Sequence, residues 1–68
     1  MDVKTEVGLC AGEVYNYLSG RGQVPVIDVV NNVKHDHMIV IAALGWLLRE
    51  DKINATAAGK RVLVSLKQ

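Results

Sequence analysis

Residues able to bind a metal or react as nucleophiles are sparse in this 68-residue chain, and only one group of them is contiguous. The segment His35-Asp36-His37 places two imidazoles beside a carboxylate, which are common metal ligands. A mononuclear site needs further ligands, and the sequence offers only Cys10 and scattered carboxylates. A turn in which Asp36 caps the following helix explains the same residues, and matches to motifs this short mostly have no functional meaning. We therefore predict neither a metal site nor a bound cofactor.

Catalytic residues are equally hard to recognise. Cys10 is the only cysteine and lies in an apolar helical segment, which is typical of an inert core residue and excludes an intramolecular disulfide. No serine-histidine-aspartate order, phosphate-binding loop or paired acid and base stands out in the sequence. We therefore predict a protein without enzymatic activity.

Composition and charge limit the classes of partner. A chain of 68 residues makes at most one domain, here residues 1–68, and so small a core is often stabilised by association with a partner. The net charge of +1 gives no strong electrostatic reason to expect nucleic acid or a membrane. The longest uncharged apolar run, Met38 to Leu48, is shorter than the ~20 residues of a membrane-spanning helix. The first residues lack the layout of a secretory signal, so we expect a cytoplasmic protein without a membrane partner.

Hydrophobic periodicity predicts three helices. The first runs from Thr5, a candidate N-cap, to about Ser19, and ends at the glycines of "SGRG". The second occupies "VIDVVNNV" after Pro25, and the third runs from the Asp36 cap to about Glu50. The apolar face of the first helix consists of Val7, Ala11, Val14 and Leu18, and that of the second of Val26, Val29, Val30 and Val33.

Extended segments complete the order of elements. Val24, between a glycine-rich turn and Pro25, suits a short strand. The segment "KINATAAGKRVLVSL" predicts two strands around a turn that contains Gly59, with alternating side chains in the second strand. Helix, short strand, helix, helix and β-hairpin is the order of a winged helix-turn-helix, an α+β fold.

The segments "AALGWLLREDKI" and "AGEVYNYLSGRGQVPV" carry a closer likeness. Together they resemble a family of short stand-alone winged helix-turn-helix proteins without an assigned biochemical function. The resemblance covers roughly Val7 to Leu66 and implies the winged-helix fold and DNA binding. It implies no catalytic residues.

The third helix is the main source of functional information. In a helical projection at 100° per residue, one side of this helix should face the first two helices. That side carries Val40, Leu44 and Leu47, and more loosely Ala43 and Leu48. The opposite side is almost uncharged, whereas a helix that reads DNA needs basic and polar side chains there. This outer side carries Met38, Ile39, Ala42, Gly45, Trp46 and Arg49.

The leading hypothesis is a non-enzymatic interaction module. Small residues beside large apolar ones make a surface on which another helix can lie, and exposed apolar patches usually mark interaction sites. We expect a homodimer, or a complex with another protein, and the alternative is that Trp46 is buried beneath the hairpin or the N-terminus. The predicted protein interface consists of Met38, Ile39, Ala42, Gly45 and Trp46.

The second hypothesis is a DNA-binding transcriptional regulator that contacts double-stranded DNA through the third helix and a basic hairpin. Acidic Asp36, Glu50 and Asp51 are interspersed among the cationic residues, and a solvated turn accounts equally for the charges at the hairpin tip. The candidate DNA contacts are His37, Arg49, Lys52, Lys60 and Arg61.

Overall fold

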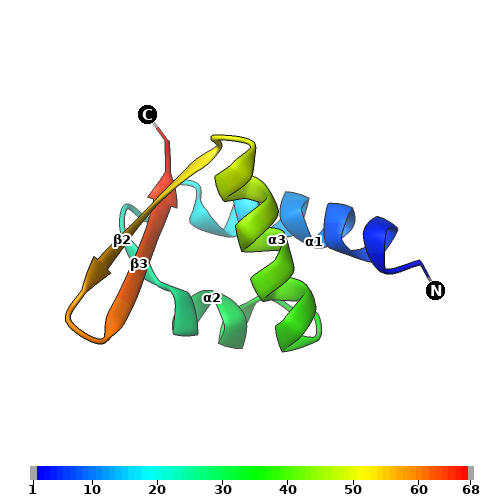
Figure 1. Ribbon diagram of the computed structural model, residues 1–68, viewed down its shortest axis with the longest axis horizontal. Helices are drawn as coiled ribbons and strands as arrows, with labels where there is room; N and C mark the ends of the chain where they lie inside the picture. The colour runs from blue at the N-terminus through cyan, green and yellow to red at the C-terminus, as the bar shows by residue number, and fades with distance from the viewer. Residues whose placement is uncertain (1, 68) are drawn as a thin grey trace.

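The computed structural model describes residues 2–67, which form three helices and a three-stranded antiparallel sheet (Figure 1). The predicted order of elements and the winged-helix fold class are confirmed. The elements are α1 (Val3–Leu18), β1 (Val24–Pro25), α2 (Val26–Asn32), α3 (His37–Arg49), β2 (Ile53–Ala58) and β3 (Arg61–Leu66).

The first helix begins earlier than its sequence pattern predicts. Asp2, not Thr5, is the N-cap of α1, and its carboxylate accepts hydrogen bonds from the Lys4 backbone N–H and from the Thr5 hydroxyl, both at 3.1 Å. An acidic N-cap also complements the positive end of the helix dipole. After α1, Gly20 has a φ of +77°, a backbone conformation that residues with a Cβ atom rarely adopt.

The two ends of α3 are fixed by local hydrogen bonds. Asp36 is its N-cap as predicted, and Asp36 Oδ1 accepts a hydrogen bond of 2.9 Å from the Met38 backbone N–H. At the other end, the N–H groups of Asp51 and Lys52 donate to the carbonyls of Leu48 and Leu47 at 3.1 and 2.9 Å. This pair of bonds is a Schellman motif, and Asp51, with a φ of +62°, occupies the position where glycine is usual.

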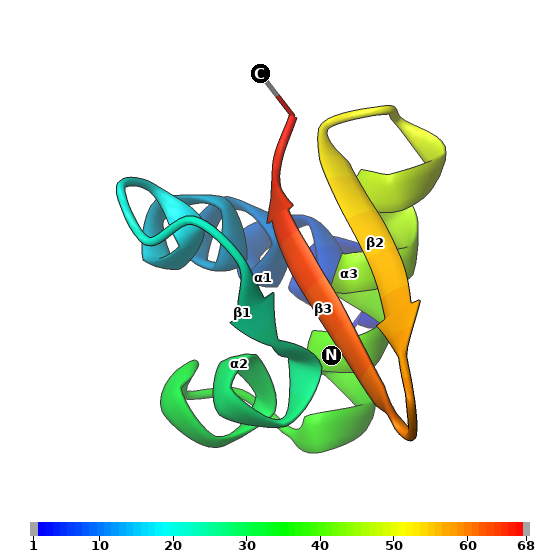
Figure 2. The same cartoon turned by 90° about the vertical axis from the view of Figure 1, so that its left-hand side faces the viewer.

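The sheet has the strand order β1-β3-β2, and Figure 2 shows the three strands side by side with α1 and α3 behind them. The hairpin register runs without interruption from Ile53 opposite Leu66 to Ala58 opposite Arg61. The two-residue turn between β2 and β3 starts at Gly59, which has a φ of +63°, as a type II′ turn requires.

Helices and sheet share one apolar core made mainly of valine, leucine and alanine. The predicted inner faces of α1 and α2 are confirmed, although Val7 and Val26 are only partly buried. Leu48 is the exception to the predicted face of α3, because its side chain is 48% exposed. The buried residues are Cys10, Ala11, Val14, Leu18, Val24, Val29, Val30, Val33, Val40, Ala43, Leu44, Leu47, Ile53 and Val64.

None of the helices in residues 2–67 is both long enough and apolar enough to span a bilayer.

Candidate binding surfaces around the third helix

The side of α3 that faces away from the core is apolar over most of its length. Met38 is 73% exposed and Trp46 is 49% exposed, and the small residues Ala42 and Gly45 lie exposed between them. We call these four residues the outer face of α3. Ile39, which the helical projection places on the same side, is half-buried and packs against the core at the edge of this face.

Trp46 lies on the flank of α3 that faces α1. It borders a shallow depression of 310 Å³ together with Gly8, Gly12 and Tyr15 of α1 and Lys52 after α3. Half of the indole surface remains in contact with solvent. Trp46 is therefore neither a core residue nor covered by the hairpin.

Gly45 has no packing role within the protomer. A Cβ atom built at this position meets nothing within 4 Å, apart from the backbone of its own helix and its chain neighbours. A glycine inside a helix costs about 1 kcal/mol relative to alanine. The fold of a single protomer therefore offers no steric reason for glycine at the centre of the outer face.

The opposite flank of α3 borders a groove that the sequence analysis missed. The groove has a volume of 710 Å³ and lies between α2, α3 and the β2–β3 hairpin. Ile41 and Leu48 of α3 are 52% and 48% exposed there, and Ile27 and Val62 face it from α2 and β3. The spacing of Ile41, Leu44, Gly45 and Leu48, at i, i+3, i+4 and i+7, is the signal in the sequence that would have found this flank.

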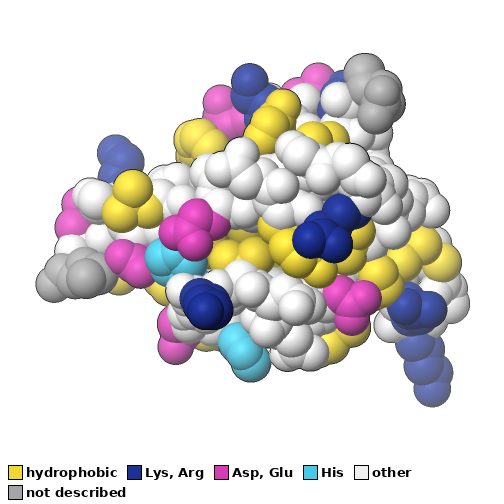
Figure 3. All heavy atoms as spheres, turned by 180° about the vertical axis from the view of Figure 1, so that it is seen from behind, with side chains coloured by type: hydrophobic (Ala, Val, Ile, Leu, Met, Phe, Trp, Pro, Cys, Tyr) yellow, Lys and Arg dark blue, Asp and Glu magenta, His cyan; other side chains and the backbone are white. Residues whose placement is uncertain are grey.

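The candidate DNA-contacting residues are exposed but lie at two ends of the molecule. His37 begins α3, and Lys60 and Arg61 form the hairpin tip; all three line the groove, and Figure 1 shows α2 between the tip and the beginning of α3. Arg49 and Lys52 lie at the other end of α3, beside Glu50 and Asp51. Figure 3 shows basic side chains projecting from the corner of the hairpin tip, and mixed charges over the rest of that face.

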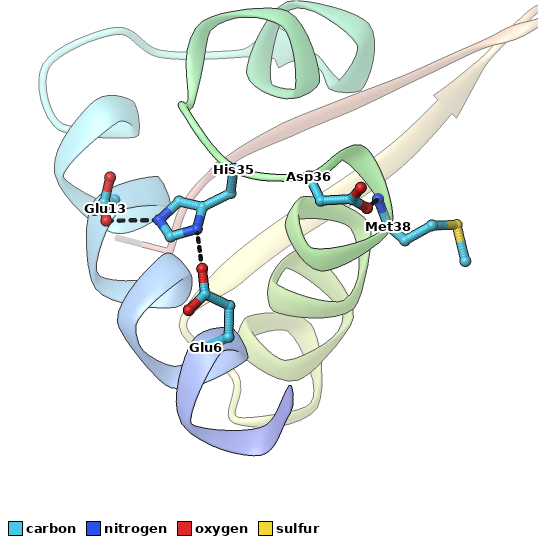
Figure 4. Close-up of polar contacts among 5 residues, drawn as sticks. All are labelled: Glu6, Glu13, His35, Asp36 and Met38. Atoms are coloured by element: carbon cyan, nitrogen blue, oxygen red, sulfur yellow. Dashed lines mark hydrogen bonds and ion pairs between the residues drawn. The ribbon is translucent and has the colours of Figure 1, made fainter. Parts of the chain in front are cut away.

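The residues of the His35-Asp36-His37 segment have separate roles. Figure 4 shows the His35 ring between two carboxylates of α1: Nδ1 lies 2.8 Å from Glu6 Oε2, and Nε2 lies 2.7 Å from Glu13 Oε2. The hydrogen bond to Glu13 raises the pKa of His35, desolvation opposes this, and the bond to Glu6 adds to the rise. Because a carboxylate only accepts hydrogen bonds, both contacts are satisfied at once by the doubly protonated ring. His35 thus ties the α2–α3 loop to α1, while Asp36 caps α3.

Metal ligands and reactive groups are the next candidates. In residues 2–67, no set of three or more histidine, cysteine, aspartate or glutamate side chains is arranged to hold a metal ion. Cys10 is completely buried, and burial, followed by the charges of Glu13 and Glu6, raises the pKa of its thiol. A raised thiol pKa opposes formation of the nucleophilic thiolate.

Comparison with known proteins agrees with the architecture. Residues 1–66 match the family model described as "Winged helix-turn-helix domain (DUF2582)". The chain is also similar to an uncharacterized protein, MJ1608, of Methanocaldococcus jannaschii, with 31% identity over 68 residues and 97% of each chain covered. Winged helix-turn-helix domains are in general binding modules for DNA or protein rather than catalysts. The chain belongs to the DUF2582 family of winged helix-turn-helix domains.

Proposed function

We propose that this protein is a non-enzymatic interaction module that forms a homodimer through the outer face of α3. The observation that carries the proposal is the combination of exposed Met38 and Trp46 with an unobstructed Gly45 between them. Ile39 contributes at the edge of the contact. Apolar residues exposed next to one another on a small protein usually mark an interaction site.

A symmetric contact suits this surface. In a two-fold dimer the same patch of both copies meets itself, so large side chains of one copy must oppose small ones of the other. Ala42 and Gly45 supply the small positions, and Met38 and Trp46 supply the large ones. Helix axes that cross over small side chains can approach to the short end of the usual range of about 8–10 Å.

Size does not exclude such a dimer. A standard interface covers about 800 Å² on each partner, whereas the protomer exposes 4694 Å². A helix of 13 residues is about 20 Å long, which is sufficient for the centre of such a contact.

The test is the effect of Ala42→Glu on association, measured by sedimentation velocity over a range of protein concentrations. The exposed position tolerates glutamate in the monomer, but the dimer would bury one unpaired carboxylate from each copy near the two-fold axis. We expect the wild type to dimerise and the variant to remain monomeric at concentrations at least 100-fold higher. Asn31→Glu, an equally charged change at an exposed position of α2, is the matched control and leaves the dimer intact. A wild type that is monomeric throughout, or an Ala42→Glu variant that associates like the control, contradicts the proposal.

A second candidate function is DNA binding through the hairpin, favoured by the exposed Lys60 and Arg61 at its tip. His37 lines the groove together with them, while Arg49 and Lys52 would add contacts at the far end of α3. Phosphate contacts of this kind give affinity that falls steeply with salt. In an NMR titration with a random-sequence duplex, DNA binding predicts salt-reversible shifts at the hairpin tip that disappear in Lys60→Glu/Arg61→Glu. Unchanged spectra at low salt refute it.

A further inference from the structure

The groove between α2, α3 and the hairpin has the dimensions of a small-molecule site. Its volume of 710 Å³ falls within the range of about 300–1,000 Å³ that is usual for ligand pockets. Its walls come from three different elements, each of which contributes an apolar side chain that remains exposed. These side chains are Ile27 of α2, Ile41 and Leu48 of α3, and Val62 of β3.

Charge is distributed unevenly along the groove. His37, Lys60 and Arg61 are its lining residues with basic side chains, and within residues 2–67 no aspartate or glutamate lines it. Figure 1 shows the hairpin tip and the beginning of α3 along the lower edge of the molecule, with α2 between them. The other end, near Leu48 and Ile53, is formed by apolar residues. Lys60 and Arg61 therefore make the hairpin-tip end of the groove cationic, and the remaining lining residues apart from His37 carry no ionisable side chain.

We propose that this groove binds a free single-chain anionic amphiphile, a molecule with one anionic head and one aliphatic tail. The head lies between Lys60 and Arg61 of the hairpin tip. The tail runs along the groove past Val62 and Ile41 toward Leu48 and Ile53. The β2 strand (Ile53–Ala58), 6 residues long, spans about 20 Å between the apolar end of the groove and the hairpin tip, which suits a medium- or long-chain fatty acid.

The one-ended charge distinguishes this ligand from other occupants of an apolar groove. A helical peptide would present its polar side chains at intervals along its whole length, whereas the cationic residues here lie at one end only. A second copy of the chain would bring its own apolar surface but no single anionic group to that end. Met38, Ala42 and Trp46 of the outer face do not line the groove, so the groove site shares only Gly45 with the proposed dimer contact.

The test is NMR titration of the methyl and amide groups with three ten-carbon probes: decanoate, decanol and decyltrimethylammonium, all kept below micelle-forming concentrations. We expect decanoate to shift Ile27, Ile41, Leu48 and Val62, and to bind about tenfold more tightly than decanol because two cationic side chains face its head. Decyltrimethylammonium should bind least tightly. Decyl phosphate, tested in parallel, distinguishes a preference for carboxylate from one for phosphate.

Variants separate the two ends of the site. Lys60→Glu/Arg61→Glu should lower decanoate affinity about tenfold or more while leaving decanol affinity unchanged. Ile41→Asp should weaken both probes, because it places a carboxylate where the tail lies. Leu9→Asp is the matched control, because Leu9 is a 62% exposed residue of α1 outside the groove. All these variants change exposed positions, so amide spectra can verify the fold before titration.

Repeating the titration in the Ala42→Glu background separates this inference from the proposed dimer. Decanoate binding to a monomeric Ala42→Glu protein supports the groove site whatever the oligomeric state of the wild type. Equal affinity for decanoate and decanol, or shifts confined to the depression at Trp46, would overturn the proposal. So would groove shifts that appear only on raising the protein concentration, which would assign the groove to a second copy. Binding to phosphatidylglycerol vesicles without binding to monomeric decanoate would assign it to a membrane surface instead.

Discussion

Replacing Gly45 with alanine should stabilise the monomer and weaken the dimer. Gly45 lies inside α3, and a Cβ atom there meets nothing within 4 Å, so the methyl group causes no clash in a single protomer. Helix propensity alone then stabilises the fold by about 0.8–1 kcal/mol. For a chain of 68 residues this corresponds to a rise in Tm of about 4–8 °C. In the proposed dimer the same methyl group overpacks the centre of the contact, at a cost of about 1–3 kcal/mol.

Two measurements test this prediction, one of monomer stability and one of dimer dissociation. Thermal unfolding at a dilution where the protein is monomeric measures the intrinsic change, and sedimentation velocity at higher concentration measures dimer dissociation. We expect the dissociation constant to rise about tenfold or more, since each 1.4 kcal/mol is a factor of ten. Gly12→Ala is the control for stability, because Gly12 lies inside α1 with equally open space at Cβ, and it should raise Tm by a similar amount. Asn31→Ala, at an exposed position of α2 outside the outer face, is the control for association and should leave dissociation unchanged.

Two results would refute the reasoning. If Gly45→Ala lowers the Tm of the monomer while Gly12→Ala raises it, the space beside Gly45 is occupied within the protomer. If Gly45→Ala stabilises the monomer and leaves the dimer equally tight, Gly45 is not at the centre of the interface.

Two further predictions concern the monomer. The raised pKa of His35 means that its bonds to Glu6 and Glu13 contribute stability that is fully present below the unfolded pKa of 6.5 and is lost as the pH rises through the higher folded pKa. The urea midpoint of the wild type should therefore fall as the pH rises over that window, and the midpoint of His35→Gln should not. His37→Gln is the control and should show the same fall as the wild type. A wild-type midpoint that stays flat or rises over that window would contradict this prediction. At the end of α3, Asp51→Gly should be about 1 kcal/mol more stable than Asp51→Asn, because both lose the exposed 2.5 Å ion pair with Lys67 but glycine adopts a φ of +62° at lower cost. If chemical denaturation shows that Asp51→Asn is more stable than Asp51→Gly, then the left-handed backbone conformation at position 51 is not strained.

The fold was predictable because its local signals agree with one another. Asp36 is an N-cap by residue type and by observed bond, and the glycines after α1 end the helix where the sequence predicts. The main miss at a helix end was Asp2, because Thr5 is also a good capping residue and only the structure shows it bonded to Asp2 instead. The Schellman motif was invisible for a similar reason: aspartate at position 51 replaces the glycine that normally marks it.

The surfaces were predictable only in part, because periodicity identifies which side of a helix is buried but not what lies beside it. The angle of Leu48 on α3 places it near the core, but the side chain lines the groove between α3 and the hairpin and remains half exposed. The contact of His35 with Glu6 and Glu13 joins residues 29 and 22 positions apart. A contact over that separation follows from how α1 packs against the α2–α3 loop, and no local pattern encodes it.

The composition of α3 connects these surfaces. Between His37 and Arg49 the helix contains no charged side chain, so it is apolar on every side. Helices of this kind are normally buried all round, yet in the protomer only Val40, Ala43, Leu44 and Leu47 are buried. The hairpin could have covered one flank and α1 the other, but each leaves an open surface, the groove and the depression at Trp46. A DNA-reading helix would resolve this by placing basic residues on its outer side, whereas in α3 the residues with basic side chains, His37 and Arg49, lie at the two ends. The remaining way to remove the outer face from water is contact with another apolar surface, which the proposed dimer would supply as the same face of a second copy.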